Sequence, residues 1–286
     1  MNKRSGNAPL AWMLLLAFVF LSLRGLERPA AVVDRAGEPL PVERVAPEGP
    51  GADFAAPPES RRITLANGLH IHEGHVAAAL GAGNRKAPTW SAFAWLFDRQ
   101  VVATVAPGFD QRHHFASAFL VGYVPFPNVD AWVPLVALAQ SKAYEFDHDQ
   151  FPGRGEIWQT SREAFYYPTG DCEDHAIALA DWLIGLGHDA RVVIGRLKGE
   201  GHAWVVLHAG DQTYLLEATN KRPAQALPLA SRHPEYQPEA MFNRETYWVN
   251  AGPVLTTDYR SPHWQERSTF TRTAAKTGSD QLPAGS

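Results

Sequence analysis

Residues 170–176 read Gly-Asp-Cys-Glu-Asp-His-Ala, and the fold that the sequence predicts depends on this stretch. Cys172 is the only cysteine among 286 residues, which excludes a framework of intrachain disulfides. Asp171 is a residue type that caps helix N-termini, and Asp174 lies three residues later, where a capping box places an acid. Cys172 therefore becomes the first residue of a predicted helix.

The predicted helix has an apolar stripe along one face. Apolar residues recur at spacings of three and four, and Gly187 follows them as a stop signal. A thiol in the first turn lies at the positive end of the helix dipole, which favours the thiolate, whereas the neighbouring acids Asp171 and Glu173 disfavour it. The stripe consists of Ala176, Leu179, Ala180, Leu183 and Leu186.

Three short strands are predicted after this helix, at residues 190–195, 202–208 and 212–219. The last two are joined by Ala209, Gly210 and Asp211, which are suited to the turn of a β-hairpin. A small antiparallel sheet is therefore expected to follow the helix.

This hairpin brings a histidine and an acid together. With a turn on Gly210-Asp211, His202 lies opposite Thr219, and Glu217 becomes its diagonal neighbour on the same face of the sheet. A four-residue loop keeps this register, whereas a three-residue loop without a bulge would separate the two side chains. An imidazole oriented by an acid is the partner that a cysteine nucleophile needs, and His202 is a better candidate than His175.

Taken together, these motifs resemble the transglutaminase-like superfamily. They are G-D-C-E-D-H-A at 170–176, G-H-A-W-V at 201–205 and L-E-A-T at 216–219. Upstream, E-I-W-Q-T-S-R-E-A-F at 156–165 is similar to the Trp-Gln-Thr-Pro-x-Glu run of the bacterial transglutaminase-like cysteine proteinases. The resemblance covers residues 131–222, and the cysteine, the histidine and the acid occur in the order of the family.

The resemblance implies an α+β fold with a papain-like core, in which the helix that bears the cysteine packs on an antiparallel β-sheet. It also implies a triad that acts on amides by peptide hydrolysis, deamidation or acyl transfer. In this chain Cys172 would be the nucleophile, His202 the general base and Glu217 the orienting acid. Two positions depart from the family pattern: Glu217 stands where Asp is usual, and Ser161 replaces the proline of the bacterial run.

Calcium is the one ion that the resemblance to this superfamily implies. Some members of the superfamily bind it through acids that flank the cysteine, and Asp171 and Glu173 match those positions. Two acids alone do not specify an ion, so we predict no cofactor and no metal ligands, with calcium as the alternative.

Each candidate residue also has a purely structural interpretation. Cys172 can be a buried small side chain, His202 an ordinary strand histidine and Glu217 a solvated strand residue. Asp171 and Asp174 suit helix capping better than ion binding. A zinc site is disfavoured because the histidine spacing matches no common zinc motif; its ligands would be Cys172, His175, His202 and His208.

The N-terminus predicts export. Lys3 and Arg4 precede an apolar run from Ala8 to Leu23, which we interpret as an uncleaved membrane anchor, with a cleaved signal peptide as the alternative. The expected location is the cell membrane, single-pass, with the catalytic domain in the periplasm or outside. Cleavage would make the protein secreted or periplasmic.

Several elements are expected outside this core. Asn67-Gly68 predicts a hairpin, residues 131–146 a helix, and residues 90–105 a buried helix followed by a strand. We divide the chain into five segments: a signal or anchor at 1–26, a Pro/Ala-rich linker at 27–60, an N-terminal elaboration at 61–130, a catalytic core at 131–265 and a disordered tail at 266–286.

The composition limits the classes of molecule that are expected to bind this protein. The net charge is −4 and no basic run occurs, so nucleic acid is not expected to bind. The expected partners are a protein or peptide substrate and the inner membrane, through the N-terminal helix. We therefore predict an exported thiol-dependent amide hydrolase or acyltransferase. The alternative is a non-catalytic binding or scaffold module of the cell envelope that retains the same fold.

Overall fold

The computed structural model describes residues 59–76, 91–222 and 227–274. The predicted anchor and residues 27–58 of the predicted linker lie outside the described residues, as do residues 275–286. Among the helices of the described part, none is long and apolar enough to cross a membrane.

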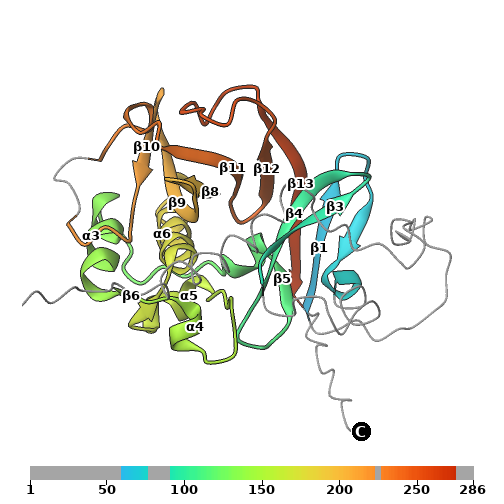
Figure 1. Cartoon of the computed structure of the whole chain (residues 1–286), viewed down its shortest axis with the longest axis horizontal. Coiled ribbons are helices and arrows are strands. Elements are labelled where there is room, and N and C mark those ends of the chain that lie inside the picture. The colour runs from blue at the N-terminus through green and yellow to red at the C-terminus, as the bar shows by residue number, and fades with distance from the viewer. Residues whose placement is uncertain (1–58, 77–90, 223–226, 275–286) are drawn as a thin grey trace, which may run out of the picture.

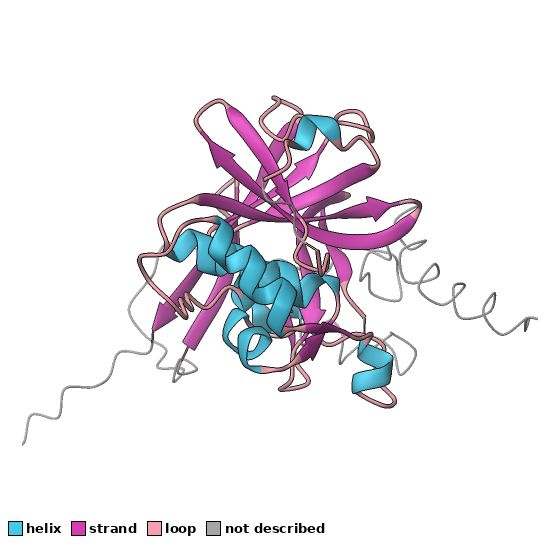
Figure 2. Ribbon diagram, turned by 90° about the vertical axis from the view of Figure 1, so that its left-hand side faces the viewer, coloured by secondary structure: helices cyan, strands magenta, loops and turns pink. Residues whose placement is uncertain are grey.

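A large, mostly antiparallel sheet forms the centre of the molecule, and helices pack against part of it (Figures 1 and 2). Its eight strands have the order β10-β9-β8-β11-β12-β13-β1-β2. They are β1 (Glu59–Leu65), β2 (His70–His72), β8 (Asp189–Leu197), β9 (Glu200–Ala209), β10 (Gln212–Leu216), β11 (Tyr236–Phe242), β12 (Thr246–Asn250) and β13 (Trp264–Ala274).

Two smaller sheets complete the strand structure. One has the order β3-β4-β5 and lies beside β1 and β13 (Figure 1); its strands are β3 (Phe93–Phe97), β4 (Gln100–Pro107) and β5 (His113–Phe115). In the other, β6 (Ala143–Tyr144) pairs in parallel with β7 (Thr169–Gly170). This second pairing fixes Tyr144 opposite Gly170, two residues before Cys172.

The helices gather near the β8–β10 end of the large sheet (Figure 1). The longest, α6, packs on β8 and β9, and its Leu179 and Leu183 belong to the same apolar core as Val205 and Leu207 of β9. The helices are α3 (Trp132–Ser141), α4 (Asp147–Gln150), α5 (Ser161–Tyr166) and α6 (Cys172–Gly185), with 3-10 turns η2 (Ala116–Phe119) and η3 (Ala230–Arg232). The result is an α+β architecture consistent with a papain-like or transglutaminase-like core.

Strand β9 separates two apolar cores because successive side chains point to opposite faces. Ala203, Val205 and Leu207 belong to the core that contains α6. Trp204 and Val206 belong to the core on the other face, which also contains Tyr236 and Tyr259.

Several sequence predictions about this region are confirmed. Helix α6 begins at Cys172, and Gly187, with a φ of +90°, follows its end. The hairpin of β9 and β10 has the expected register, with Gln212 opposite Ala209. The turn at Asn67-Gly68 joins β1 to β2.

Two other predictions are wrong. The expected helix in residues 90–105 is absent, because this segment forms the β3–β4 hairpin around Asp98 and Arg99, both with positive φ. The turn carries no glycine, so the usual signal was missing. Residues 266–274 of the expected disordered tail belong to β13, which pairs with β12 and β1. Phe270 packs in a core on one face of this strand, while Thr residues, which favour strands, recur along it.

A buried carboxylate fixes helix α6 to its surroundings. Asp181, with no exposed surface, accepts hydrogen bonds from the backbone N–H groups of Gly122 and Tyr123 and from the Ser161 hydroxyl. The Arg244 Nε donates to its other oxygen at 2.5 Å. Helix α6 is thus held from three separate segments.

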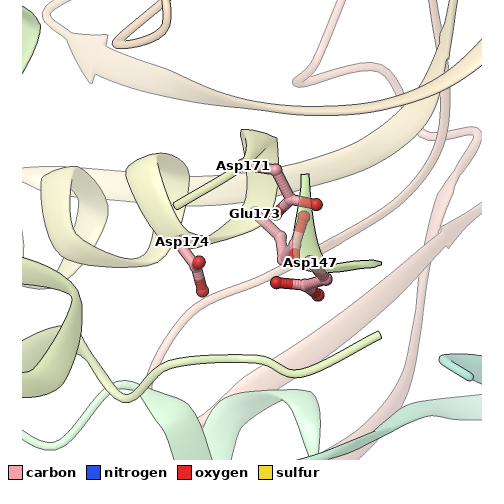
Figure 3. A group of neighbouring side chains, drawn as sticks. All are labelled: Asp147, Asp171, Glu173 and Asp174. Carbon is pink, nitrogen blue, oxygen red and sulfur yellow. The ribbon is translucent and has the colours of Figure 1, made fainter. Parts of the chain in front are cut away.

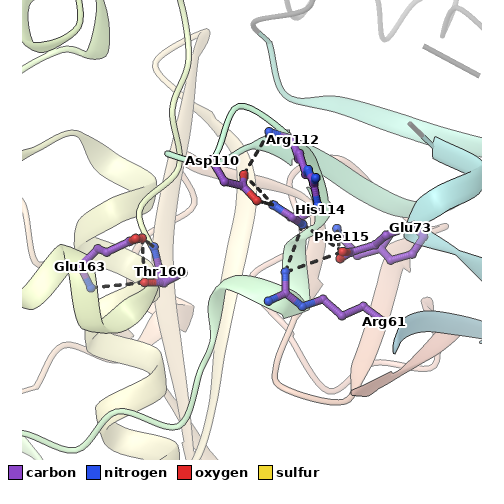
Figure 4. A network of polar contacts seen from close by, with 8 residues as sticks. All are labelled: Arg61, Glu73, Asp110, Arg112, His114, Phe115, Thr160 and Glu163. Atoms are coloured by element: carbon purple, nitrogen blue, oxygen red, sulfur yellow. Dashed lines mark hydrogen bonds and ion pairs between the residues drawn. The ribbon is translucent and has the colours of Figure 1, made fainter. Parts of the chain in front are cut away.

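His114 forms a second polar network at the junction of the large and small sheets (Figure 4). Its Nδ1 lies 2.9 Å from Glu73 Oε2, and its Nε2 lies 2.9 Å from Asp110 Oδ1. Burial lowers the pKa of His114, but the hydrogen bonds to Glu73 and Asp110 outweigh this effect, and the net pKa is raised. The same view shows the capping box of α5, in which Thr160 and Glu163 bond reciprocally.

The raised pKa makes this network pH-dependent. A histidine whose pKa is higher in the folded state stabilises the fold fully below its unfolded pKa of about 6.5, and the contribution is lost as the pH rises through the folded value. We expect His114→Gln to lower the free energy of unfolding by about 1 kcal/mol more near pH 5.5 than near pH 8.5. Denaturant titration measures this difference. The control His148→Gln, at an exposed ion pair, should show none; equal losses for His114→Gln at both pH values would contradict the prediction.

Candidate active site

Cys172 lies at the start of α6, against strand β9. The Ala203 backbone N–H donates to the thiol sulfur, and the thiol donates to Glu173 Oε2 at 3.4 Å. Ala203 follows His202 directly in β9. The structure therefore places the thiol beside the strand residue next to the predicted base.

His202 and Glu217 meet as the sequence predicts. Their Nε2 and Oε2 atoms are 2.6 Å apart, and both side chains are largely buried. The longer glutamate is accommodated because its other oxygen, Oε1, accepts from the backbone N–H of Thr219 at 3.1 Å and from its hydroxyl at 2.6 Å. The pKa of Glu217 is lowered: burial raises it, but the bonds from His202 and Thr219 prevail.

This pairing assigns the two ring nitrogens of His202. Since Nε2 is engaged by Glu217, the nitrogen left to accept a thiol proton is Nδ1. Among the described residues, the recorded hydrogen bonds of the sulfur are those to Glu173 and Ala203, and none joins it to the imidazole. The structure thus brings the histidine and the acid into contact and places the cysteine on the neighbouring element.

The helix start differs from its prediction in one respect. Asp171 is the N-cap residue, but its side chain makes no capping hydrogen bond, and Asp174 Oδ1 accepts from the Gln159 backbone N–H at 2.8 Å instead. The predicted capping box is therefore wrong. Its acids turn inward, toward other carboxylates.

Four buried carboxylates meet beside Cys172 (Figure 3). One ligand oxygen from each lies within 4.8 Å of all the others. In each residue one carboxylate oxygen is buried without a hydrogen-bond partner. The four residues are Asp147 at the start of α4, Asp171 at the N-cap of α6, and Glu173 and Asp174 in its first turn.

Burial and mutual repulsion control the charge of this acid cluster. Burial, followed by the negative charge of Asp174, raises the pKa of Asp147 to about 9. The pKa values of Asp171, Glu173 and Asp174 are also raised well above their ordinary range, first by burial. Such a cluster favours either protons or a cation between the oxygens.

Lys142 is a cation next to the acid cluster. It is 3% exposed, and its Nζ donates to Gln159 Oε1 at 3.0 Å, to the Tyr167 carbonyl at 3.2 Å and to the Thr169 carbonyl at 2.6 Å. Burial lowers its pKa to about 8, against the nearby carboxylates, which raise it. Its ammonium is thus bound to neutral oxygens, and the cluster keeps its unpaired carboxylate oxygens.

The thiol is affected by the same charges. The pKa of Cys172 is raised well above its ordinary value, first by burial and next by the negative charge of Asp171. The expected lowering by the helix dipole does not prevail. A thiolate at this position requires positive charge from the imidazole, from a cation in the acid cluster, or from both.

Other roles that residues near Cys172 could have in the site are excluded. Gln159 is fully buried, and its Nε2 already donates to the Thr169 carbonyl at 3.3 Å, so its amide is not available to a substrate oxygen. His175 Nδ1 bonds the Asp171 carbonyl at 2.7 Å, and its Nε2 lies 3.1 Å from Lys221 Nζ, which excludes it as the base. Within the described residues, the disfavoured zinc ligands do not come together.

Sequence reasoning missed Asp147 and Lys142. Asp147 lies 25 positions before Cys172 in the sequence, and no spacing links the two. Lys142 lies within the helix predicted at residues 131–146, where an exposed lysine is the usual expectation, so the sequence carries no signal for its burial.

Part of this chain is similar to a peptidase-like domain. A model of the CEP76 peptidase-like domain matches residues 156–268. The Centrosomal protein of 76 kDa of Mus musculus is 41% identical over 64 residues, which are 22% of this chain and 10% of that protein. The protein of the same name from Pongo abelii is 32% identical over 114 residues, 35% of this chain and 17% of that protein. This chain therefore spans less than a fifth of the length of these relatives.

Among solved structures, calcium-bound LapG of Legionella pneumophila is similar with a TM-score of 0.36 and 18% identity, over 52% of this chain and 81% of that chain. A likeness at this level says nothing about activity. The domain model and the curated relatives that match are centrosomal, whereas the sequence motifs resembled bacterial proteinases most closely.

These relatives correct the predicted location. They are named as centrosomal proteins of animals, which does not agree with a periplasmic domain on a membrane anchor. The prediction of a single-pass membrane protein, or of a secreted or periplasmic one, is therefore wrong. The location prediction was wrong because it depended on the apolar run at residues 8–23 alone. This run lies outside the described residues.

The acid cluster yields a prediction about stability. A carboxyl group whose folded pKa is raised, as for Asp147, stabilises the fold below its unfolded pKa of about 4 and loses that contribution as the pH rises through the folded value. In the presence of a chelator near pH 8, we expect Asp147→Asn to raise the free energy of unfolding by about 1–3 kcal/mol, because the amide removes a group that resists ionisation. Its oxygen can still accept from the Ile157 backbone N–H.

Denaturant titration in chelator measures this effect. The matched control is Asp149→Asn, two residues away and exposed, which should change stability little. A destabilised Asp147→Asn protein would show that the carboxylate is tolerated in its charged form.

Proposed function

We propose that this chain is a thiol-dependent amide hydrolase or acyltransferase that acts on a protein or peptide. Cys172 is the nucleophile, His202 the general base and Glu217 the acid that orients it. The observation that carries the proposal is the 2.6 Å contact between His202 and Glu217, next to the strand residue whose N–H contacts the thiol.

The reaction follows from this arrangement. His202 Nδ1 accepts the thiol proton while Nε2 donates to Glu217, and the sulfur attacks the carbonyl carbon of the amide. The oxyanion is stabilised by unpaired backbone N–H groups in the first turn of α6. The imidazolium then gives its proton to the leaving amine, and an acyl-enzyme remains. Water resolves it in hydrolysis, our default, and a second amine resolves it in acyl transfer.

The four-carboxylate cluster fits calcium. Calcium takes six to eight oxygen ligands at about 2.3–2.6 Å, largely from carboxylates and carbonyls. Asp147, Asp171, Glu173 and Asp174 each offer a buried oxygen without a partner. A bound calcium ion would supply positive charge beside the thiol, and these four side chains would hold it.

A second candidate function is a non-catalytic binding or scaffold module. The observation that favours it is the thiol itself, whose pKa is raised well above its ordinary value by burial and by the negative charge of Asp171. The centrosomal name of the relatives is compatible with a scaffold. In this case the fold would serve recognition without chemistry.

Thiol labelling decides between the two functions, since Cys172 is the only cysteine. We expect iodoacetamide to alkylate Cys172 with a rate that falls about 100-fold or more in His202→Ala, because the general base is lost. Glu217→Gln should lower the rate less. Mass spectrometry follows the adduct, and His148→Ala, at an exposed histidine, is the control. Equal labelling of the wild type and His202→Ala would favour the non-catalytic module.

Calcium binding is testable without activity. We expect calcium at about 100 times its Kd to stabilise the wild-type fold by about 2.7 kcal/mol, and Asp171→Asn to abolish most of this shift. Calorimetry and thermal unfolding with the metal alone measure it, with Asp149→Asn as the control. Labelling of Cys172 should also accelerate with calcium, because the ion offsets the acids that oppose the thiolate. A wild-type protein that calcium does not stabilise would remove the ion from the proposal.

A further inference from the structure

The carboxylate of Glu217 has a fourth hydrogen-bond donor that the proposed triad does not use. Besides Thr219 and His202, the Tyr236 hydroxyl donates to Glu217 Oε2 at 3.2 Å. This is the oxygen that also holds His202. Tyr236 and the imidazole thus share one acceptor atom.

Tyr236 reaches this atom from a distant strand. It is the first residue of β11, and β8 lies between β11 and β9 in the sheet. Gly195 of β8 lies directly opposite His202 on one side and Pro238 on the other. A Cβ at this position would lie 2.8 Å from the Trp204 ring and 2.1 Å from the Gln237 carbonyl oxygen. Because Gly195 has no side chain, the neighbouring strands and the aromatic rings can lie close to one another at this position.

Two aromatic rings enclose the imidazole in that space. Trp204 stacks on His202 with centroids 6.1 Å apart, and the Tyr236 ring lies 6.2 Å from the imidazole. Trp204 and Tyr236 meet edge to face at 5.0 Å. The aromatic packing fixes the Tyr236 ring, so that its hydroxyl keeps a defined direction.

We propose that Tyr236 is a positioning residue of the Cys172 site: its hydroxyl holds Glu217 Oε2 in the place where that oxygen engages His202 Nε2. The inference rests on the proposed function. It also accounts for a glutamate where the related sequences usually have an aspartate. The longer side chain is anchored at one oxygen by Thr219 and at the other by Tyr236, and His202 Nδ1 is thereby left for the thiol.

The shared oxygen gives the contact a measurable effect. A hydrogen bond to a carboxylate favours its charged form, so the loss of the Tyr236 hydroxyl should raise the pKa of Glu217 and leave more negative charge for His202. The negative charge that is no longer shared with a hydroxyl holds the proton on the imidazole more strongly, so the rate of thiol attack should fall at the acid end of its pH profile.

Tyr236→Phe tests the proposal, with Tyr259→Phe as the matched control. Tyr259 lies in the same apolar core, and its hydroxyl contacts Trp204 and not Glu217. In Tyr236→Phe we expect the pKa of Glu217, followed by NMR of its carboxyl carbon, to rise by about half a unit. The acid limb of the Cys172 alkylation profile should move upward by a similar amount, about a threefold loss of rate on that limb. Tyr259→Phe should leave both unchanged.

The outcomes separate the two proposals. An unchanged Glu217 titration in Tyr236→Phe, or a changed one in both variants alike, would overturn the role of Tyr236. A His202-dependent thiol with an unmoved acid limb would overturn it as well, with the proposed function intact. A wild-type thiol that reacts independently of His202 would instead remove the proposed function, whatever Glu217 does.

Discussion

The position of α6 depends on a charged group that has no contact with water. Asp181 lies in the C-terminal half of this helix and accepts hydrogen bonds from backbone and side-chain donors of other segments. A buried carboxylate is tolerated only when its lone pairs are satisfied, so these segments must come together for the helix to pack. The helix is thereby held from one end, while its contacts with β8 and β9 place the thiol beside the strand that carries His202.

A conflict of charge follows from that placement. The first turn of α6 brings Cys172 to β9, but it also buries Asp171, Glu173 and Asp174 against Asp147. The thiol gains a backbone N–H donor and loses the electrostatic advantage that a helix N-terminus normally gives. His202 precedes Ala203, the residue of β9 that contacts the sulfur, and its imidazole is bonded by the acid Glu217. Carboxylates beside Cys172 therefore oppose its thiolate form, whereas the carboxylate of Glu217 bonds the imidazole of His202.

The sequence predicts local features of this site better than its surroundings. Helix α6 and the β9–β10 register follow from apolar spacing and a Gly-Asp turn, so the contact of His202 with Glu217 could be expected. Asp147, Lys142 and Tyr236 could not, because each enters from a separate element that only tertiary packing brings near. The inward orientation of the Asp171 and Asp174 side chains could not be predicted either, because an acid that caps a helix and an acid that is buried have the same spacing in the sequence. The hairpin at Asp98-Arg99 was not predicted because its turn contains no glycine. Strand β13 was not predicted because threonine is common both in strands and in disordered tails.

The pairing of the first and last described strands has an architectural consequence. Glu59 of β1 lies opposite Ala274 of β13 in an antiparallel ladder, so the two ends of the described part of the chain lie at neighbouring points, about 5 Å apart. A unit with adjacent entry and exit can be inserted into a loop of another domain without forcing that domain open. Adjacent ends of this kind allow such a unit to be accommodated in chains of very different length.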